Sequence, residues 1–264
     1  MDYNAVPGVT IITSTIRPQF MQQIFQNYAR QKWVKKELII VLNRNKISIE
    51  PYLQLAQQYP GVRILRQPQS KNLGACLNFA AARAQYTYIA KFDDDDYYAP
   101  SYIPEAMALF RKVKADMVGK RTCFFYMPHR SLLLLRQMPI RPYSRCRKIA
   151  GATIMFHRRV FNKVKFSTQV RQGTDVRFVS ASVRKGFRVF TTSPYNFAAI
   201  RRANRYSHTW KISDQRLLGS KKRLLIRTGD YKRHVNRSLD QLKGIRAYPA
   251  PQPLYGKDSL PYSL

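Results

Sequence analysis

The sequence predicts an α/β protein in which a mostly parallel sheet is flanked by helices. Apolar strand-like runs alternate with segments of helical periodicity, and 45% of the 264 residues are hydrophobic. A chain of this length and composition can bury one large core or two small ones. Continuous apolar strands separated by helices are typical of a parallel sheet covered on both faces.

The N-terminal part of the chain shows this alternation most clearly. Residues 8–15 form an apolar run that ends in small polar side chains, and residues 18–31 carry apolar side chains at helical spacing. The same pattern predicts further strands at 36–45, 62–68 and 86–92 and further helices at 50–61 and 72–84. A sheet of this kind binds its ligands at the carboxyl ends of its strands.

The rest of the chain alternates less regularly. Patterning predicts a helix at 101–115, a strand and hairpin within 115–138, a strand that enters a short helix at 151–161, a helix at 173–186, and strands at 187–192 and 195–202. We expect Thr174 to cap the helix at 173–186 and Gly186 to end it.

The composition changes at about residue 212. Residues 214–229 are expected to form a basic helix, and residues 247–264 are a Pro-rich tail. We therefore divide the chain into a first domain, residues 1–211, and a basic helical and Pro-rich C-terminal extension, residues 212–264.

Acidic residues are rare but clustered. The chain has 47 Lys and Arg against 14 Asp and Glu, and four of these acids are consecutive, from Asp93 to Asp96, directly after a predicted strand. In an extended segment Asp93 and Asp95 point to one side and Asp94 and Asp96 to the other. Carboxylates about 6 Å apart repel by about 3 kcal/mol per pair at an effective dielectric constant of about 20. A bound divalent cation removes this repulsion, which favours a cation clamp for a phosphate-bearing substrate. A solvated acidic turn and a structural calcium site are the alternatives.

Four motifs resemble the inverting glycosyltransferases of the GT-A fold, family two. They are VTIITSTIRP, ELIIVLN, NLGACLNFAAARAQYTYIAKFDDDDYYAP and GTDVRF with RKGF. The motifs follow the family's order, and the resemblance covers about residues 8–210. The resemblance implies a Rossmann-like sheet, a nucleotide-diphosphate sugar donor, expected to be UDP-linked, and Mn²⁺ or Mg²⁺ as cofactor. It places Asp93 and Asp94 at the donor and Asp95 and Asp96 at the metal, although four identical residues leave the register open.

The resemblance also implies a nucleotide pocket. Thr13, Ser14 and Arg17 are expected to line the base and ribose, and Asn43, after the second strand, belongs to the same pocket. Lys71, Asn72 and Gly74 are expected to close over the base and diphosphate. The family usually carries an acid where this chain has Asn43. Asn72 can equally be an ordinary helix N-cap.

Inverting transfer needs a general base, and the resemblance assigns that role to Asp175. Asp175 is the only acid between Asp116 and Asp214, and Thr174 stands where the family often has Glu. The alternative is a carboxylate that interacts with the helix dipole, worth about 0.3–1 kcal/mol. Relatives also place a His near the metal or diphosphate, a role that falls on His208; a half-buried His beside a Trp is the alternative.

Two basic residues after the strand at 195–202 stay open at this point. Arg201 and Arg202 can face phosphates or can be surface charge. The chain lacks the Gln-x-x-Arg-Trp motif of processive members and any apolar run of about 18 residues. Both absences favour the addition of a single sugar over polysaccharide synthesis.

The net charge of +33 implies a polyanionic partner. Expected partners are a phosphate-bearing cell-envelope polymer, an acidic glycan or an anionic membrane leaflet. A nucleic-acid-binding protein or metal-dependent nuclease is the rival function, but no zinc finger or RNP-like motif supports nucleic acid. A catalytically inactive scaffold is the third reading.

The N-terminus and the cysteines predict where the chain works. The N-terminus has no signal-peptide pattern, and the three cysteines are odd in number and far apart. We therefore expect a cytoplasmic protein with free thiols, with peripheral attachment to the inner face of the membrane as a variant of that prediction.

Overall fold

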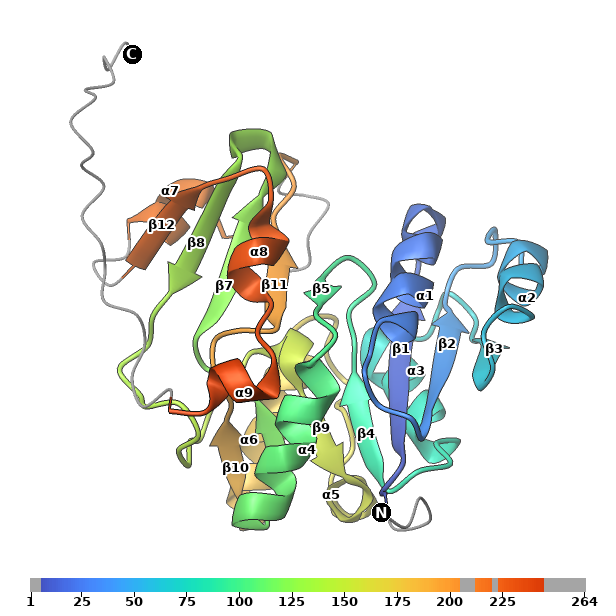
Figure 1. The fold of residues 1–264 in the computed structure, drawn as a ribbon. Helices are drawn as coiled ribbons and strands as arrows, with labels where there is room; N and C mark the ends of the chain where they lie inside the picture. Colours follow the sequence, from blue (N-terminus) through green and yellow to red (C-terminus); the bar gives the residue numbers. More distant parts are fainter. Residues whose placement is uncertain (1–5, 205–211, 220–222, 245–264) are drawn as a thin grey trace.

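The computed structural model describes residues 6–204, 212–219 and 223–244, and it contains two sheets (Figure 1). The first has the strands β1 (Val9–Thr15), β2 (Lys36–Leu42), β3 (Val62–Arg66), β4 (Tyr88–Lys91), β6 (Met117–Gly119), β9 (Met155–His157) and β10 (Val189–Thr191). The second has β5 (Tyr97–Tyr98), β7 (Cys123–Met127), β8 (Leu132–Arg136), β11 (Phe197–Ile200) and β12 (Arg223–Arg227).

The first sheet has the order β10-β6-β9-β4-β1-β2-β3. All its neighbouring strands are parallel except β9, which runs antiparallel to both β4 and β6. The expected α/β class with a mostly parallel sheet is therefore confirmed. The second sheet has the order β12-β8-β7-β11-β5 and is mostly antiparallel.

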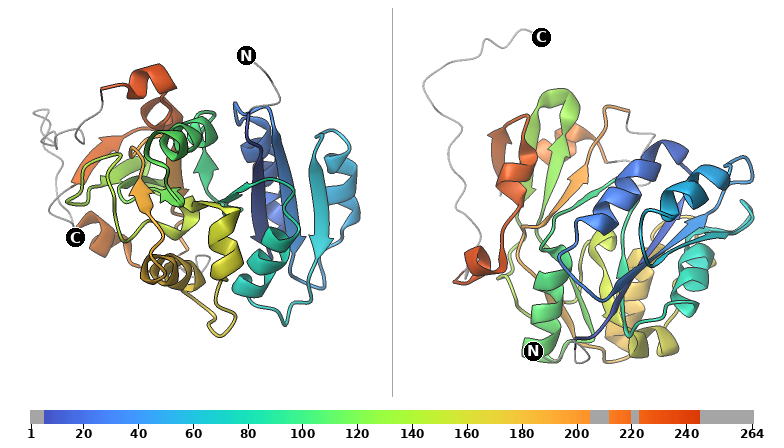
Figure 2. Two further views of the ribbon diagram at one scale, coloured as in Figure 1. Left: turned by 90° about the horizontal axis from the view of Figure 1, so that it is seen from below. Right: turned by 45° about the vertical axis from the view of Figure 1, so that its right-hand side comes forward.

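Helices cover both faces of the first sheet, as Figure 2 shows. They are α1 (Met21–Ala29), α2 (Glu50–Ala56), α3 (Leu73–Ala82), α4 (Tyr102–Val113), α5 (Arg158–Lys163) and α6 (Thr174–Arg184). In β1, Ile11 packs in the core cluster with α1, α2 and α4, whereas Ile12 packs in the cluster with α3, α5 and α6. This alternation follows from the two-residue period of a strand.

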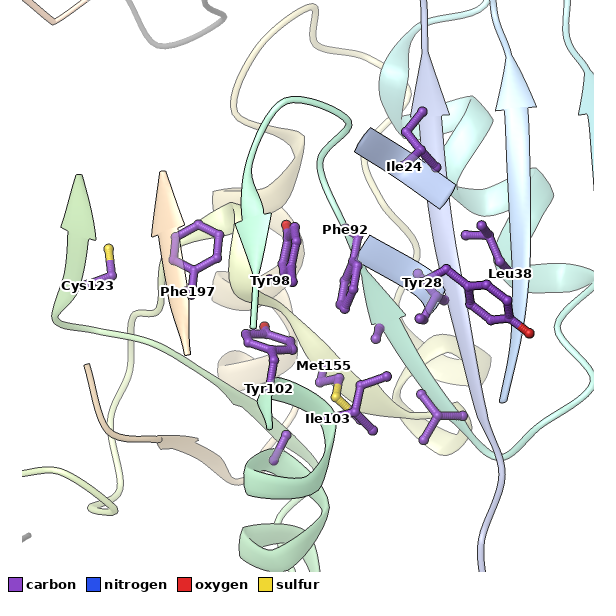
Figure 3. Packing of buried hydrophobic residues seen from close by; sticks show 14 of the residues in the cluster. Ile24, Tyr28, Leu38, Phe92, Tyr98, Tyr102, Ile103, Cys123, Met155 and Phe197 are labelled. Carbon is purple, nitrogen blue, oxygen red and sulfur yellow. The ribbon is translucent and has the colours of Figure 1, made fainter. Parts of the chain in front are cut away.

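An aromatic cluster joins the two sheets. The rings of Phe92 and Tyr98 are stacked with their centroids 3.7 Å apart, and Phe197 of β11 packs against Tyr98 (Figure 3). The Tyr98 hydroxyl donates to the Ala152 carbonyl at 2.6 Å and accepts from the Asp93 amide at 2.8 Å. Phe92 and Tyr98 flank the four aspartates, so this packing fixes both ends of the acidic segment.

The C-terminal segment differs from the expected basic helix at 214–229. It forms the short helix α7 (Asp214–Leu218), which ends at Gly219, and then the strand β12, which pairs antiparallel with β8. Two short helices follow, α8 (Tyr231–Val235) and α9 (Leu239–Leu242). The apolar residues of 223–227 thus complete a sheet edge, a tertiary partner that helical periodicity does not reveal. The Pro-rich segment 247–264 lies outside the described residues.

The start of α6 also differs from expectation. Its N-cap is Gly173, with φ of 77°, and Thr174 is the first helical residue. The Thr174 hydroxyl donates to the Ser167 carbonyl at 2.9 Å instead of capping the helix. Gly186, with φ of 85°, follows the end of α6 as expected. Within the described part of the chain, no helix combines the length and apolar character that crossing a bilayer requires.

Candidate active site

The four aspartates lie where β4 ends, beside the end of β1. The residues Asp94 to Asp96 form a turn and a bend, so the expected extended alternation of their side chains is wrong. The turn gives the carboxylates different sets of partners. Asp93 pairs with Lys91, Asp94 accepts from Thr15 at 2.6 Å, and Asp96 accepts from the Ile200 amide at 3.0 Å.

Two arginines hold the middle of the turn. Arg17 pairs with Asp94 and donates to Asp95 at 2.9 Å, while Arg202 pairs with Asp95 at 2.8 Å. Both guanidinium groups lie over the Phe20 ring, 4.9 and 5.0 Å from its centroid. The repulsion predicted within the aspartate run is therefore offset by cations of the chain itself.

The partners give the carboxylates different protonation behaviour. Burial alone would raise the pKa of Asp95, but the charges of Arg17 and Arg202 hold it below its usual range. Burial, followed by repulsion from Asp95 and Asp93, raises the pKa of Asp96 well above the usual range. The arginines thus favour the ionised form of Asp95, whereas burial favours the neutral form of Asp96, which is tied to β11.

A buried lysine connects the acidic turn to α6. Lys91 donates to Asp93 and to the Gly151 carbonyl at 3.2 Å, and its Nζ lies 3.3 Å from Asp175 Oδ2. A Cβ at Gly151 would stand 2.6 Å from Asp175 Oδ2, so only glycine leaves room for this carboxylate. The structure therefore brings Asp175, 80 residues beyond Asp95 in sequence, to the same site.

The two oxygens of Asp175 are not equivalent. Oδ2 faces Lys91, whereas Oδ1 is buried and has no hydrogen-bond partner among the residues that the structure describes. Burial raises the pKa of Asp175, and nearby Asp93 acts in the same direction against the opposing charge of Lys91. A raised pKa makes a carboxylate a stronger proton acceptor.

The residues expected in the nucleotide pocket have mixed surroundings. Thr13 is buried and its hydroxyl has no partner within the described part of the chain, while Ser14 is half-buried and Lys71 is exposed. Asn43 donates to the Pro68 carbonyl at 2.8 Å and so fixes the loop after β3.

Two other expected pocket residues support the segment before α6. Asn72 accepts from the Ala75 amide at 3.0 Å as the N-cap of α3, and its amide donates to the Thr168 carbonyl at 2.6 Å. Gly74 lies against the same segment, because a Cβ there would stand 2.1 Å from the Ser167 carbonyl oxygen. His208 lies outside the described residues.

Three site residues were not assigned from the sequence. Lys91 is a charged residue inside an otherwise apolar buried strand, a signal that could have identified it. For Arg202, the sequence left two alternatives, a contact with phosphate or a surface charge. Tyr52 was treated only as part of a helix, yet its buried hydroxyl has no partner in the described residues, and both burial and the charge of Asp94 raise its pKa to about 12.

The donors at the turn are of the right kind for a hard divalent cation. Within residues 6–204, 212–219 and 223–244, no three His, Cys, Asp or Glu side chains converge on one ion position. Mg²⁺ is, however, usually held by one or two carboxylates together with water and substrate phosphates. Asp95, whose ionised form the two arginines favour, is one carboxylate of the kind that such a site uses.

A model of the family described as glycosyl transferase family 2 matches residues 10–202. A search of curated proteins by sequence finds no match.

Solved structures share the fold at low identity. TarS of S. aureus, residues 1–349 in complex with UDP-GlcNAc, has a TM-score of 0.59 and 14% identity, over 75% of this chain and 59% of that chain. The mannosyltransferase PcManGT of Pyrobaculum calidifontis, in complex with GDP-Man and Mn²⁺, has a TM-score of 0.56 and 16% identity, over 74% of this chain and 56% of that chain. This chain thus spans less than two thirds of the length of either neighbour.

Proposed function

Because this chain belongs to glycosyl transferase family 2, we propose that it moves one sugar from a nucleotide-diphosphate donor to an acceptor hydroxyl, with inversion and with a divalent metal ion. The neighbours with bound UDP-GlcNAc and GDP-Man support a nucleotide-sugar donor. UDP is the nucleotide that we expect, and addition is non-processive.

The observation that carries the proposal is the environment of Asp175. Its Oδ1 is a buried acceptor without a donor among the described residues, and such groups are rare in folded proteins. The hydroxyl of an acceptor sugar would supply that donor. Asp175 then takes the hydroxyl proton as the oxygen attacks the donor sugar, while Lys91 holds the carboxylate in place through Oδ2.

Inversion takes place in one displacement, which needs a general base but no second carboxylate that acts as nucleophile. The acceptor oxygen attacks from the side opposite the leaving diphosphate, so one displacement inverts the anomeric centre. Asp93 is paired with Lys91 and therefore serves to orient the donor rather than to attack it.

The leaving diphosphate needs positive charge. Arg17 and Arg202 lie together at the end of β1 and bring two guanidinium groups, which are suited to bidentate phosphate contacts. A divalent ion held by Asp95 and Asp93 would neutralise further charge on the diphosphate. Thr13, Ser14, Asn43 and Tyr52 are the residues that we assign to the nucleotide side.

Thermal shift tests this proposal directly. UDP, GDP, ADP and CMP are added with and without Mn²⁺, and we expect one nucleoside diphosphate to raise the melting temperature only when metal is present. If none of the nucleotides changes the melting temperature at any metal concentration, the proposed donor class is wrong.

The net charge of the chain is the basis for our proposal about the chemical class of the acceptor. With +33 in total, far more positive charge is present than a diphosphate requires. We expect a polyanionic acceptor or an anionic surface that presents it, at the cytoplasmic side of a membrane.

A further inference from the structure

The positive charge of the chain is concentrated in one stretch, residues 141–188. This stretch contains 13 Lys and Arg and a single acid, Asp175. Residues 9–100, a stretch almost twice as long, contain 12 Lys and Arg and six acids. The net charge of +33 is therefore unevenly distributed, and residues 141–188 supply the surface best suited to an anionic partner.

Most cations of this stretch are not neutralised by carboxylates. Arg159 and Arg188 pair with Asp116, and Asp175 pairs with buried Lys91. Ten other cations are exposed and belong to no ion pair among the described residues: Arg141, Arg145, Arg147, Lys148, Lys163, Lys165, Arg171, Arg177, Arg184 and Lys185. Protein surfaces usually mix both signs of charge, so this surface is unusual.

Two cavities gather half of these ten cations around α6. Lys165, Arg177 and Arg184 line the first cavity, of about 480 Å³, between α6 and the segment after α5. Arg145 and Arg147 line the second cavity, of about 490 Å³, between the end of α6 and a segment that bridges to the edge strand β10. Both cavities are thus cationic, and neither is lined by an acid.

The two cavities meet at the last turn of α6. Arg184 lines the first cavity, and Val183, the preceding residue, lines the second. Arg177 and Arg184 are seven positions apart and so lie on one side of the helix, about 10 Å apart along its axis. We name this surface the α6 face and define it by Arg145, Arg147, Lys165, Arg177 and Arg184.

An exposed apolar side chain lies within the α6 face. Val176 lines the first cavity and is 65% exposed, and it is the one exposed large hydrophobic residue of the stretch 141–188. The core contacts of α6 come from its other side, where Phe178 and Val179 are buried. Peripheral membrane binding uses this combination of cations and an apolar side chain that can enter the headgroup region.

We propose that the α6 face docks the protein on an anionic lipid leaflet. This inference rests on the proposed function, which expects an anionic surface to present the acceptor, and it adds the face that contacts that surface. A single linear polymer would have to cross the last turn of α6 to reach both cavities. Headgroup phosphates of separate lipids can enter each cavity, while Val176 reaches the apolar boundary of the leaflet.

The main experiment removes charge from the α6 face of the full chain. Arg177→Gln/Arg184→Gln changes the first cavity, and Arg145→Gln/Arg147→Gln changes the second. All four side chains are exposed, so both variants should keep the wild-type melting temperature. Cosedimentation with vesicles of phosphatidylglycerol or of neutral phosphatidylcholine, across a salt series, measures the affinity for each leaflet.

A matched control removes two exposed charges from the segment between α1 and β2. Lys32→Gln/Lys35→Gln is suitable because these two lysines flank Val34, which is 81% exposed. The control site thus has cations beside an exposed valine, as the α6 face has, but it lacks the two cationic cavities.

We expect the wild-type protein to bind phosphatidylglycerol vesicles, more weakly as salt rises, and to leave phosphatidylcholine vesicles unbound. Each α6-face variant should lose about tenfold or more in affinity for phosphatidylglycerol, and the control variant less than about threefold. Equal losses in all three variants would overturn the inference, because the attraction would then be spread over the whole surface. Equal wild-type binding to both kinds of vesicle, or binding to neither, would also overturn it.

Val176→Asn separates a leaflet from a soluble polyanion. This substitution keeps every charge, so affinity for phosphatidylglycerol vesicles should fall about threefold or more while affinity for labelled inorganic polyphosphate stays unchanged. Val34→Asn is its control and should change neither affinity. If the two α6-face variants lose affinity for polyphosphate and keep it for vesicles, the leaflet is the wrong partner and the face binds a soluble polymer.

Nucleotide binding separates this inference from the proposed function. All three charge variants should keep the wild-type thermal shift with nucleotide and Mn²⁺, because none of them changes the acidic turn. If no nucleotide shifts even the wild-type protein while the α6-face variants still lose vesicle affinity, the donor proposal fails and the docking surface stands. A normal nucleotide shift without any vesicle binding would overturn the docking surface alone.

Discussion

The Lys91 ammonium lies 3.3 Å from Asp175 Oδ2 and also pairs with Asp93, so one buried cation links the end of β4 to the first turn of α6. Burial alone would lower the pKa of Lys91, but the two carboxylates raise it above its usual range. The lysine therefore stays charged and sets both the position and the basicity of Asp175.

Asp175→Asn removes basicity while it keeps the shape of the side chain. We expect turnover to fall by about 10²-fold or more with donor affinity little changed. Asp240→Asn, at an exposed position in α9, is the control and should retain wild-type turnover. Normal sugar transfer by the Asp175 variant would place the base elsewhere.

Lys91→Met tests the electrostatic role of the lysine through pH. Asp175 must be deprotonated to act, and burial already raises its pKa, so activity should fall on acidification above the usual Asp range. Lys91 lowers that pKa, and its removal should move the acid limb of kcat/KM to higher pH. Lys91→Arg keeps the charge and should leave the limb near its wild-type position. An unmoved limb in the Met variant, measured over the pH range where it stays folded, would contradict this role.

Asp95→Asn weakens the contacts with Arg17 and Arg202. The repulsion predicted within the aspartate run would by itself make the loss of one carboxylate neutral or stabilising. The two ion pairs reverse that expectation, and we predict a stability loss of about 1–3 kcal/mol together with the loss of Mn²⁺-dependent nucleotide binding.

Asp116→Asn is a matched control for this change. Asp116 also lies between two arginines, Arg159 and Arg188, and its side chain is 10% exposed against 12% for Asp95. It should lose comparable stability and keep nucleotide binding. Loss of nucleotide binding in both variants would mean that general destabilisation, and not the Asp95 carboxylate, accounts for the effect.

Gly74→Ala introduces a methyl group 2.1 Å from the Ser167 carbonyl oxygen. Backbone must move to make room, and we expect a loss of about 1–3 kcal/mol in the free energy of unfolding. Gly229→Ala, where no atom lies within 4 Å of the added carbon, should change stability much less. Equal chemical denaturation midpoints for the two variants would show that the segment around Ser167 yields at little cost.

The parallel core was predictable because its signals are local. The strand predicted at 36–45 is β2, Lys36–Leu42, in the structure, and it ends where its apolar residues end. The position of the acidic turn after β4 follows from the strand that precedes it. Helix boundaries were less predictable. Gly173, with its positive φ, and not Thr174, caps α6, since the Thr174 hydroxyl has a tertiary partner in Ser167.

The arrangement of the side chains in the site was not predictable, because it depends on contacts between residues that are far apart in the sequence. Arg202 approaches Asp95 because β11 pairs with β5 and β7, and Asp175 approaches Lys91 because α6 lies beside the 151–153 turn. The turn at Asp94–Asp96 replaces the extended geometry because Arg17 binds Asp94 and Asp95, Arg202 binds Asp95 as well, and the Ile200 amide binds Asp96. Distant partners of this kind decide which aspartates stay ionised.

The pairing of β12 with β8 has a consequence for truncated forms of the chain. β8 lies between β7 and β12, and its Leu133, Leu134 and Leu135 are completely buried. A chain cut after residue 211 would uncover the backbone of this leucine-rich strand along its whole length. Exposed apolar edges recruit strands from other molecules, so such a fragment would aggregate during expression even though it keeps every proposed catalytic residue.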